Sequence, residues 1–214
     1  MNKENLRVLL IGSTGVVGKH VLELALAEKC FAEVIALTRR PLPTHPNLTN
    51  PVVDLRDLPS GTDWFAVDGV ISALGTTQRI AGSPEAFREV DYGLNMAIAR
   101  TAYEGGAKCF ALTSSLGADA SSRSFYLRTK GELERDLQNI GFASLTFVRP
   151  GLLGGARSER RLAEEAGKLA LGLLGPVLPP LWRISWPCRV GSALVAAIAE
   201  GKPGRHIVES SRLA

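Results

Sequence analysis

The stretch Leu6–Gly18, LRVLLIGSTGVVG, decides the fold. It begins with a short aliphatic run that is typical of a buried strand, and it leads into apolar residues at helical spacing that predict a helix over 16–28. Gly12, Gly15 and Gly18 lie at the junction of the two elements. There, glycines permit a tight turn, a close approach of the backbone to a pyrophosphate and close helix–sheet packing. The stretch therefore predicts a dinucleotide-binding loop; the alternative is that the glycines serve only the turn and the packing.

Beyond this stretch, strands and helices alternate along the chain. Strands are predicted over 33–38, 51–53, 69–72, 108–114 and 144–149, and helices over 84–104 and 126–140. This alternation is typical of a parallel sheet with helices on both faces. After Pro150 we expect a mixed helix near 159–172, a last helix over 190–200 and an edge strand over 205–209. The predicted fold class is α/β: a doubly wound parallel sheet in one domain, 1–214, with 151–214 as a small C-terminal elaboration.

The predicted helix 84–104 has a clear start and end. Ser83 is a typical cap, Pro84 suits the first helical position, and a pair of glycines follows the helix. A uniform helical period predicts a buried stripe made of Phe87, Val90, Leu94, Ala97 and Thr101. The same helix carries Asp91 and Asn95. Helical spacing makes surface or capping positions possible for both residues; for Asn95 a place near the active site is the equal alternative.

Composition and charge exclude several classes of function. The 214 residues carry a net charge of +4 with interspersed signs, so we expect no nucleic-acid surface. Three cysteines and three histidines are scattered, so we expect neither a disulfide framework nor a metal site. The longest apolar stretch, 169–182, contains prolines and is shorter than the roughly 20 residues of a membrane span. Since the first residues do not resemble an export signal, the sequence predicts a soluble, cytoplasmic protein.

The end of the second predicted strand indicates which nucleotide binds. A site specific for NAD places an acidic residue there, where it contacts the ribose 2′-hydroxyl. This chain has Thr38-Arg39-Arg40 instead. Two guanidinium groups suit a 2′-phosphate, because each charge-assisted hydrogen bond contributes roughly 1.5–3 kcal/mol. The alternative is a pair of ordinary solvent-exposed arginines. We expect NADP(H) to be preferred over NAD(H).

Tyr126 and Lys130 lie four residues apart, and therefore on one face of their predicted helix. A nearby lysine favours the phenolate of a tyrosine, which can exchange a proton with a carbonyl or alcohol while a nicotinamide exchanges hydride. Ser114 and Ser115 end the preceding strand, at the sheet edge where such folds bind ligands. The Y-x-x-x-K pattern alone can arise by chance. Together with the glycine loop, the arginines and the serines, it predicts an oxidoreductase site.

These motifs resemble the short-chain dehydrogenase/reductase superfamily in its atypical or extended branch. More narrowly, they resemble the small NAD(P)H-binding oxidoreductases related to the mammalian HIV Tat-interacting protein. The motifs are GSTGVVG, LTRR, SALGTT, LTSSLGAD, YLRTK and VRPG, and the resemblance extends over residues 6–161. The chain departs from extended members in the short segment that follows Pro150, which leaves room for only a reduced substrate region.

The resemblance implies roles for individual residues. Tyr126 would be the acid/base, Lys130 would hold the nicotinamide ribose, and Ser115, with Ser114 as its rival, would orient the substrate. Arg39 and Arg40 would receive the 2′-phosphate. Besides these, the residues implied to contact the cofactor are Gly12, Ser13, Thr14, Gly15, Val16, Val17, Gly18, Asp54, Leu55, Leu74, Gly75, Thr76, Leu153 and Arg161.

Two functions of different classes remain open at this point. The first is an NADP-dependent oxidoreductase acting on a small-molecule carbonyl or alcohol. The second is an NADP(H)-binding regulator with a protein partner and little or no turnover, which the reduced substrate region favours and the intact serine, tyrosine and lysine set disfavours. Nucleotide-sugar epimerase or dehydratase chemistry is a weaker alternative, because little chain remains to hold the nucleotide. Superfamily members often dimerise through helices such as 84–104 and 125–140, so the resemblance also implies a homodimer.

Overall fold

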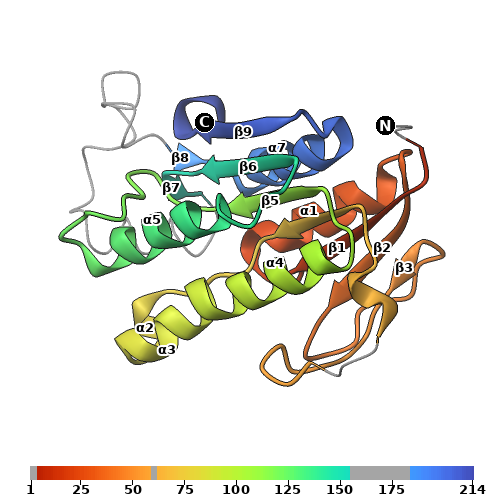
Figure 1. Cartoon of the computed structure of the whole chain (residues 1–214), viewed down its shortest axis with the longest axis horizontal. Helices are drawn as coiled ribbons and strands as arrows, with labels where there is room; N and C mark the ends of the chain where they lie inside the picture. Colours follow the sequence, from red (N-terminus) through yellow and green to blue (C-terminus); the bar gives the residue numbers. More distant parts are fainter. Residues whose placement is uncertain (1–3, 59–61, 155–183) are drawn as a thin grey trace.

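A computed structural model describes residues 4–58, 62–154 and 184–214, and in these residues seven parallel strands form one sheet (Figure 1). The strand order is β3-β2-β1-β4-β5-β6-β9. The strands are β1 (Leu6–Ile11), β2 (Phe31–Leu37), β3 (Leu48–Thr49), β4 (Gly69–Ser72), β5 (Cys109–Thr113), β6 (Ser144–Arg149) and β9 (Gly204–Glu209). Two short strands, β7 (Leu152–Leu153) and β8 (Ile184–Ser185), pair with each other outside the main sheet. The predicted fold class is thereby confirmed.

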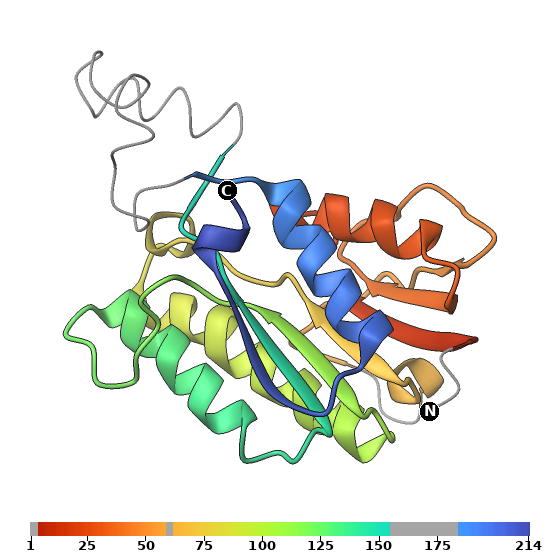
Figure 2. The ribbon, with the colours of Figure 1, turned by 90° about the horizontal axis from the view of Figure 1, so that it is seen from above.

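Helices cover both faces of the sheet (Figures 1 and 2). On one face, α1 (Val16–Ala27) packs beside α7 (Pro187–Glu200), so closely that a Cβ on Gly191 would lie 3.3 Å from the Cβ atom of His20. The other face is covered by α4 (Asn95–Glu104) and α5 (Phe125–Leu137). Strand β1 lies between β2 and β4, so the order in which strands are added to the sheet changes direction at β1. At such a switch point a crevice forms at the carboxyl ends of the strands, here those of β1 and β4.

The third strand differs from the prediction. It was expected over 51–53, whereas β3 is Leu48–Thr49, paired with Val34 and Ile35. Pro51 has no N–H group to donate to β2, the one neighbour of this edge strand in the sheet, so the regular hydrogen bonding of β3 does not continue through it. Its carbonyl oxygen instead accepts a hydrogen bond from the N–H of Thr38 at 3.2 Å, and an isolated bridge joins Thr38 to Val52.

The long predicted helix is interrupted by a π-helical segment, η2 (Glu89–Leu94), between α3 (Pro84–Arg88) and α4. The predicted cap is confirmed, since the Ser83 hydroxyl oxygen accepts the N–H of Ala86 at 3.1 Å. A π-helical turn holds more residues than an α-helical turn, so the side chains beyond it rotate around the axis. Ala97 and Thr101, predicted to be buried, are therefore exposed. The buried residues of α4 are Asn95, Met96, Ile98, Ala99 and Ala102.

The C-terminal elements mostly follow the prediction. The last helix begins earlier than expected, with Pro187 at its first position, and β9 is the expected edge strand beside β6. The helix expected near 159–172 lies outside the described residues. None of the helices that the structure describes combines the length and the apolar composition that crossing a membrane requires. A further short helix, α2 (Gln78–Ala81), lies between β4 and α3.

Candidate functional site

A cavity of about 690 Å³ opens at the carboxyl ends of β1, β4 and β5. Most of the residues that the sequence singled out line it, although they come from distant parts of the chain. These residues are Gly12, Ser13, Thr14, Gly15, Val16, Val17, Arg39, Asp54, Leu55, Leu74, Gly75, Thr76, Ser114, Ser115, Tyr126, Lys130 and Leu153. The parallel sheet explains this convergence, because it brings the carboxyl ends of all its strands to one edge.

Two of the predicted contact residues that the structure describes, Gly18 and Arg40, do not line this cavity. Gly18 lies beneath the loop, where a Cβ would approach the Gly12 carbonyl oxygen to 1.9 Å, so it serves the packing of α1 against β1. Arg40 is exposed and, unlike its neighbour Arg39, does not line the cavity. Arg161 lies outside the described residues.

The glycine loop has the shape that a phosphate group requires. Gly12 has φ +81°, and a Cβ there would lie 2.5 Å from the Ala73 carbonyl carbon, so only glycine fits between β1 and β4. The loop leads directly into α1, whose first N–H groups and partial positive charge attract anions. The hydroxyl groups of Ser13 and Thr113, both at the cavity, are buried and have no hydrogen-bond partner within the described part of the chain. These features fit the polar groups of a bound dinucleotide.

The phenol and the ammonium group reach the cavity from the first two turns of α5. Tyr126 is half-buried and its ring lies 5.6 Å from the ring of Phe87, centroid to centroid. Lys130 is buried, and its Nζ lies 2.7 Å from Oδ1 of Asp91. Asp91 and Asn95 are both fully buried, so neither is a surface group. Asp91 lines the cavity, whereas the sequence offered only a surface or capping position for it.

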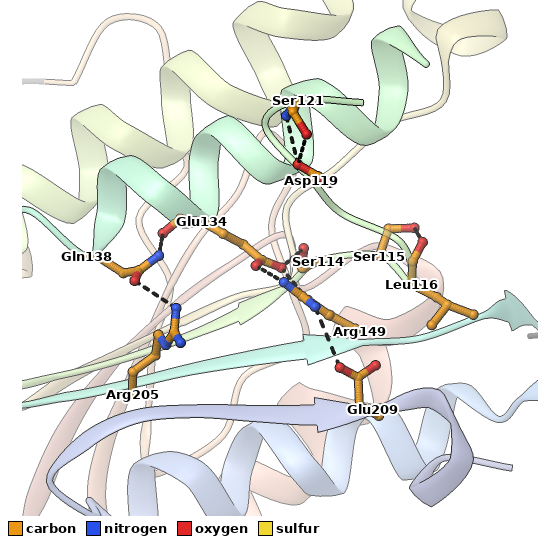
Figure 3. Close-up of polar contacts among 10 residues, drawn as sticks. All are labelled: Ser114, Ser115, Leu116, Asp119, Ser121, Glu134, Gln138, Arg149, Arg205 and Glu209. Carbon is orange, nitrogen blue, oxygen red and sulfur yellow. Dashed lines mark hydrogen bonds and ion pairs between the residues drawn. The ribbon is translucent and has the colours of Figure 1, made fainter. Parts of the chain in front are cut away.

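The two candidate serines differ in their surroundings (Figure 3). The buried Ser114 hydroxyl donates a hydrogen bond to Oε1 of Glu134 at 2.5 Å. The half-buried Ser115 hydroxyl has only a contact of 3.3 Å with the carbonyl oxygen of Leu116. The Ser114 hydroxyl is thus engaged by a buried carboxylate, whereas the Ser115 hydroxyl can rotate to face a ligand.

Glu134 is the centre of a buried charged network behind the serines (Figure 3). Its carboxylate accepts hydrogen bonds from Nε and Nη2 of Arg149 at 3.0 and 2.6 Å. These hydrogen bonds raise the pKa of the Arg149 guanidinium above its ordinary value, although burial opposes them. Nη1 of Arg149 also lies 3.6 Å from Glu209. The network therefore ties α5, which carries Tyr126, to the ends of β5, β6 and β9.

Close to Asp54 in the chain, the cavity lining includes a basic side chain that the sequence reading missed. Arg56, two residues beyond Asp54, lines the cavity, and its guanidinium pairs with Glu89 at 2.7 and 3.4 Å. The hydrogen bond to Glu89 raises the pKa of Arg56. Arg39 differs, since its exposed guanidinium has no partner among the residues described. In the sequence, the feature that could have indicated Arg56 is its position shortly after the predicted strand 51–53.

Comparison with known proteins identifies relatives. The HIM1 family model matches residues 48–175. "Protein FMP52, mitochondrial" of Candida albicans is 38% identical over 158 residues, which cover 70% of this chain and 68% of that protein. The namesake in Lodderomyces elongisporus is 37% identical over 191 residues, covering 81% and 80%, and that in Aspergillus fumigatus 38% over 180 residues, covering 79% and 76%. Since these relatives are named as mitochondrial, our expectation of a cytoplasmic protein is wrong.

Solved structures show the same fold. A short chain dehydrogenase family protein from Francisella tularensis superposes with a TM-score of 0.67 at 15% identity, covering 97% of this chain and 98% of its own. The Bordetella bronchiseptica enzyme WbmF, in complex with NADH, gives 0.71 at 17%, covering 97% and 72%. An oxidoreductase of the short chain dehydrogenase/reductase family from Burkholderia thailandensis gives 0.66 at 18%, covering 98% and 93%. The chain therefore has the fold of short-chain dehydrogenase/reductase proteins, as the resemblance implied.

Proposed function

The chain belongs to the HIM1 family, and from this membership and its dehydrogenase fold we propose that it is an NADP(H)-dependent oxidoreductase. The proposed reaction is hydride transfer between a nicotinamide and a small-molecule carbonyl or alcohol. One observation supports it most: the glycine loop, Arg39 and the set Ser115, Tyr126 and Lys130 line one cavity at the edge of the sheet. A regulator that only bound the nucleotide would need the loop but not this set.

Each group of the set has a role that follows from its chemistry. A bound nicotinamide supplies or accepts the hydride. The Tyr126 hydroxyl donates its proton to the carbonyl oxygen in reduction and receives it back in oxidation. Ser115 donates a hydrogen bond to the same oxygen and so holds the carbonyl beside the phenol. The Lys130 ammonium binds the nicotinamide ribose and stabilises the phenolate that remains after proton transfer.

The preference for NADP(H) rests on Arg39. Its guanidinium is exposed at the cavity and is not engaged by any side chain that the structure describes, so it is free to bind a 2′-phosphate. The nearby carboxylate of Asp54 is directed to its own turn, where it accepts the N–H of Arg56 at 3.0 Å. One charge-assisted hydrogen bond from Arg39 favours NADPH over NADH by about tenfold.

Cofactor binding is tested first, by thermal unfolding of the full chain with NADPH, NADP⁺, NADH and NAD⁺. A ligand at 100 times its dissociation constant adds about 2.7 kcal/mol to the free energy of unfolding. We expect the phosphorylated pair to stabilise the protein more than the other pair, and Arg39→Ala to abolish that preference. Arg40→Ala is the matched control, because Arg40 is the next residue but does not line the cavity. No stabilisation by any of the four nucleotides would overturn the proposal.

Chemistry is tested next, with Tyr126→Phe and a panel of aldehydes and ketones reduced by NADPH. The variant loses only the hydroxyl group, so we expect turnover to fall by about 10²–10⁴-fold while NADPH affinity persists. Tyr103→Phe is the control, since Tyr103 lies at the far end of α4, against Phe142. Wild-type turnover in Tyr126→Phe would exclude Tyr126 as the acid/base. Cofactor binding without turnover of any substrate would favour the regulator instead.

We also propose that the protein is mitochondrial, since its fungal relatives carry that word in their names. Fractionation of cells that express the full-length protein tests this location. Recovery of the protein with the mitochondrial matrix or membrane markers supports the proposal, and recovery with the cytosolic markers alone contradicts it.

A further inference from the structure

Asp91 is a carboxylate that the proposed reaction does not use, although it lies at the centre of the site. Its side chain is fully buried, yet the residue lines the cavity. Burial of a carboxylate is unfavourable unless the charge is paired and hydrogen-bonded. A fully buried acid at a cavity therefore has to be explained by the groups that it contacts.

Both carboxylate oxygens of Asp91 are occupied by groups of the site. Oδ1 lies 2.7 Å from Nζ of Lys130. Oδ2 accepts a hydrogen bond from the backbone N–H of Thr76 at 2.7 Å. A Cβ on Gly75 would lie 3.2 Å from Asp91 Oδ1 and 3.5 Å from Lys130 Nζ, so the loop after β4 passes directly over the ion pair. One carboxylate thus joins the lysine on α5 to the loop that would border the cofactor.

The backbone that carries Asp91 is itself anchored to the sheet. Nδ2 of Asn95 donates hydrogen bonds to the carbonyl oxygens of Val90 and Asp91 at 3.1 and 3.4 Å. Oδ1 of the same Asn95 accepts the Ser72 hydroxyl, on β4, at 2.5 Å. The carbonyls of Val90 and Asp91 belong to the π-helical segment, where helical hydrogen bonding is irregular and a side chain can take over. Strand β4 therefore fixes where Asp91 stands.

From this geometry we infer that Asp91 is a positioning residue, which holds the Lys130 ammonium in place for the cofactor and couples it to Thr76. The inference rests on the proposed function. An ammonium group has three donors. The Lys130 ammonium forms an ion pair with Oδ1 of Asp91 and makes no hydrogen bond to the other described residues. Asp91 thus fixes the direction of a long, flexible side chain and leaves donors for the ribose hydroxyls of the cofactor. It also compensates a charge that is otherwise unpaired in a buried place.

A purely structural ion pair is the alternative, and the protein contains a matched example. Arg88, three residues before Asp91 and at the end of α3, forms an ion pair with Glu132, two residues after Lys130 on α5. Neither residue lines the cavity. Glu132→Gln therefore removes a connection between these elements without touching the site, and it controls for effects of helix packing alone.

The first test needs no cofactor. Amide hydrogen exchange at Thr76 reports directly on its hydrogen bond to Asp91. We expect faster exchange in Asp91→Ala, which has no acceptor, and an almost unchanged rate in Asp91→Asn, which keeps an oxygen, and in Glu132→Gln. An unchanged rate at Thr76 in Asp91→Ala would overturn the coupling to the loop. This result stands whether or not the chain binds NADPH, so it separates a failure of the inference from a failure of the proposed function.

The second test measures NADPH affinity by fluorescence, and then turnover. Asp91→Asn removes the charge that directs Lys130, so we expect NADPH affinity and kcat to fall by about tenfold or more, the equivalent of one charge-assisted hydrogen bond. The KM for the carbonyl substrate should stay unchanged, because Asp91 acts on the lysine and not on the substrate. Glu132→Gln should retain wild-type values. Wild-type NADPH affinity in Asp91→Asn would overturn the inference.

A double variant covers the case in which Asp91→Asn does not fold, since removal of one member of a buried pair is strongly destabilising. Asp91→Asn/Lys130→Met removes both charges and restores a neutral interior. If Asp91 acts through Lys130, the double variant and Lys130→Met bind NADPH equally. A double variant that binds NADPH at least tenfold more weakly than Lys130→Met would show that Asp91 acts by another route, and would overturn the inference.

Discussion

Ser114 and Ser115 are neighbours in the chain, but their hydroxyl groups lie in different environments. Ser114 is buried, and its hydroxyl is one of three donors to the carboxylate of Glu134, with two from Arg149. Ser115 is half-buried at the cavity with one weak local contact. A hydroxyl that already satisfies a buried charge is not available to a substrate. Of these two residues, Ser115 is therefore the one that we propose for the reacting oxygen.

Replacement of each serine by alanine should therefore give opposite results. Ser115→Ala loses a hydrogen-bond donor to the developing oxyanion, so we expect turnover to fall by about a hundredfold with unchanged stability. Ser114→Ala leaves Glu134 short of a donor, so we expect the free energy of unfolding to fall by about 1–3 kcal/mol with turnover close to wild type. Urea unfolding and steady-state rates measure the two effects. An inactive Ser114→Ala of wild-type stability would reverse the assignment.

At this scale the sequence predicted the members of the site better than their roles. The spacing of Tyr126 and Lys130 was enough to place both at the cavity, because residues four apart share a helix face. It could not choose between the serines, because the deciding partner of Ser114 lies on another element, 20 residues away. Asp91 was undecided for the same reason, since its burial depends on contacts with Lys130 and Thr76.

Among the elements, the helix before β5 shows how a local irregularity changes what a pattern predicts. Its start was predicted from Ser83 and its end from the glycines after Glu104, and both are confirmed. The stripe drawn with one uniform period is wrong beyond η2, because the π-helical turn rotates the following residues. That rotation is what turns Asn95 towards β4 and keeps it buried, so the irregularity serves the site.

Helix α5 is held close to the loop that follows the serines by a glycine that the sequence reading did not single out. A Cβ on Gly131 would lie 2.1 Å from the carbonyl carbon of Asp119. Since that neighbour is backbone, Gly131→Ala has to move α5, and we expect the free energy of unfolding to fall by about 1–3 kcal/mol or more. Turnover should fall too, because Tyr126 and Lys130 move with the helix. Thermal unfolding and steady-state rates measure both losses.

Gly93→Ala is the matched control for this substitution. Gly93 is exposed on η2, and the nearest atom to an added Cβ is 4.0 Å away. Alanine is favoured over glycine inside a helix by roughly 0.5–1 kcal/mol, so this variant should be as stable as the wild type or more stable. Wild-type stability and turnover in Gly131→Ala would mean that α5 is not constrained at this contact.

For the whole molecule, the fold class was predicted mainly from the order of strands and helices along the chain. Alternating elements and right-handed crossovers leave few arrangements besides a doubly wound sheet, and the strands β1, β4 and β6 have the predicted boundaries. Strand β3 was misplaced because a two-residue strand has too little pattern to detect. The cellular location was predicted wrongly, because the lack of an export signal bears on secretion and not on import into an organelle.

The packing of α7 against α1 has a consequence for how the protein is made. Helix α1 leaves the ribosome long before its neighbour α7, because α1 ends at Ala27 and α7 begins at Pro187. Until α7 is made, the apolar residues of β4 and β5 that it covers are exposed to water. Pairings between distant segments form slowly, and exposed apolar surface is what chaperones recognise. This face of the sheet therefore stays open to chaperones on the nascent chain until α7 has been made.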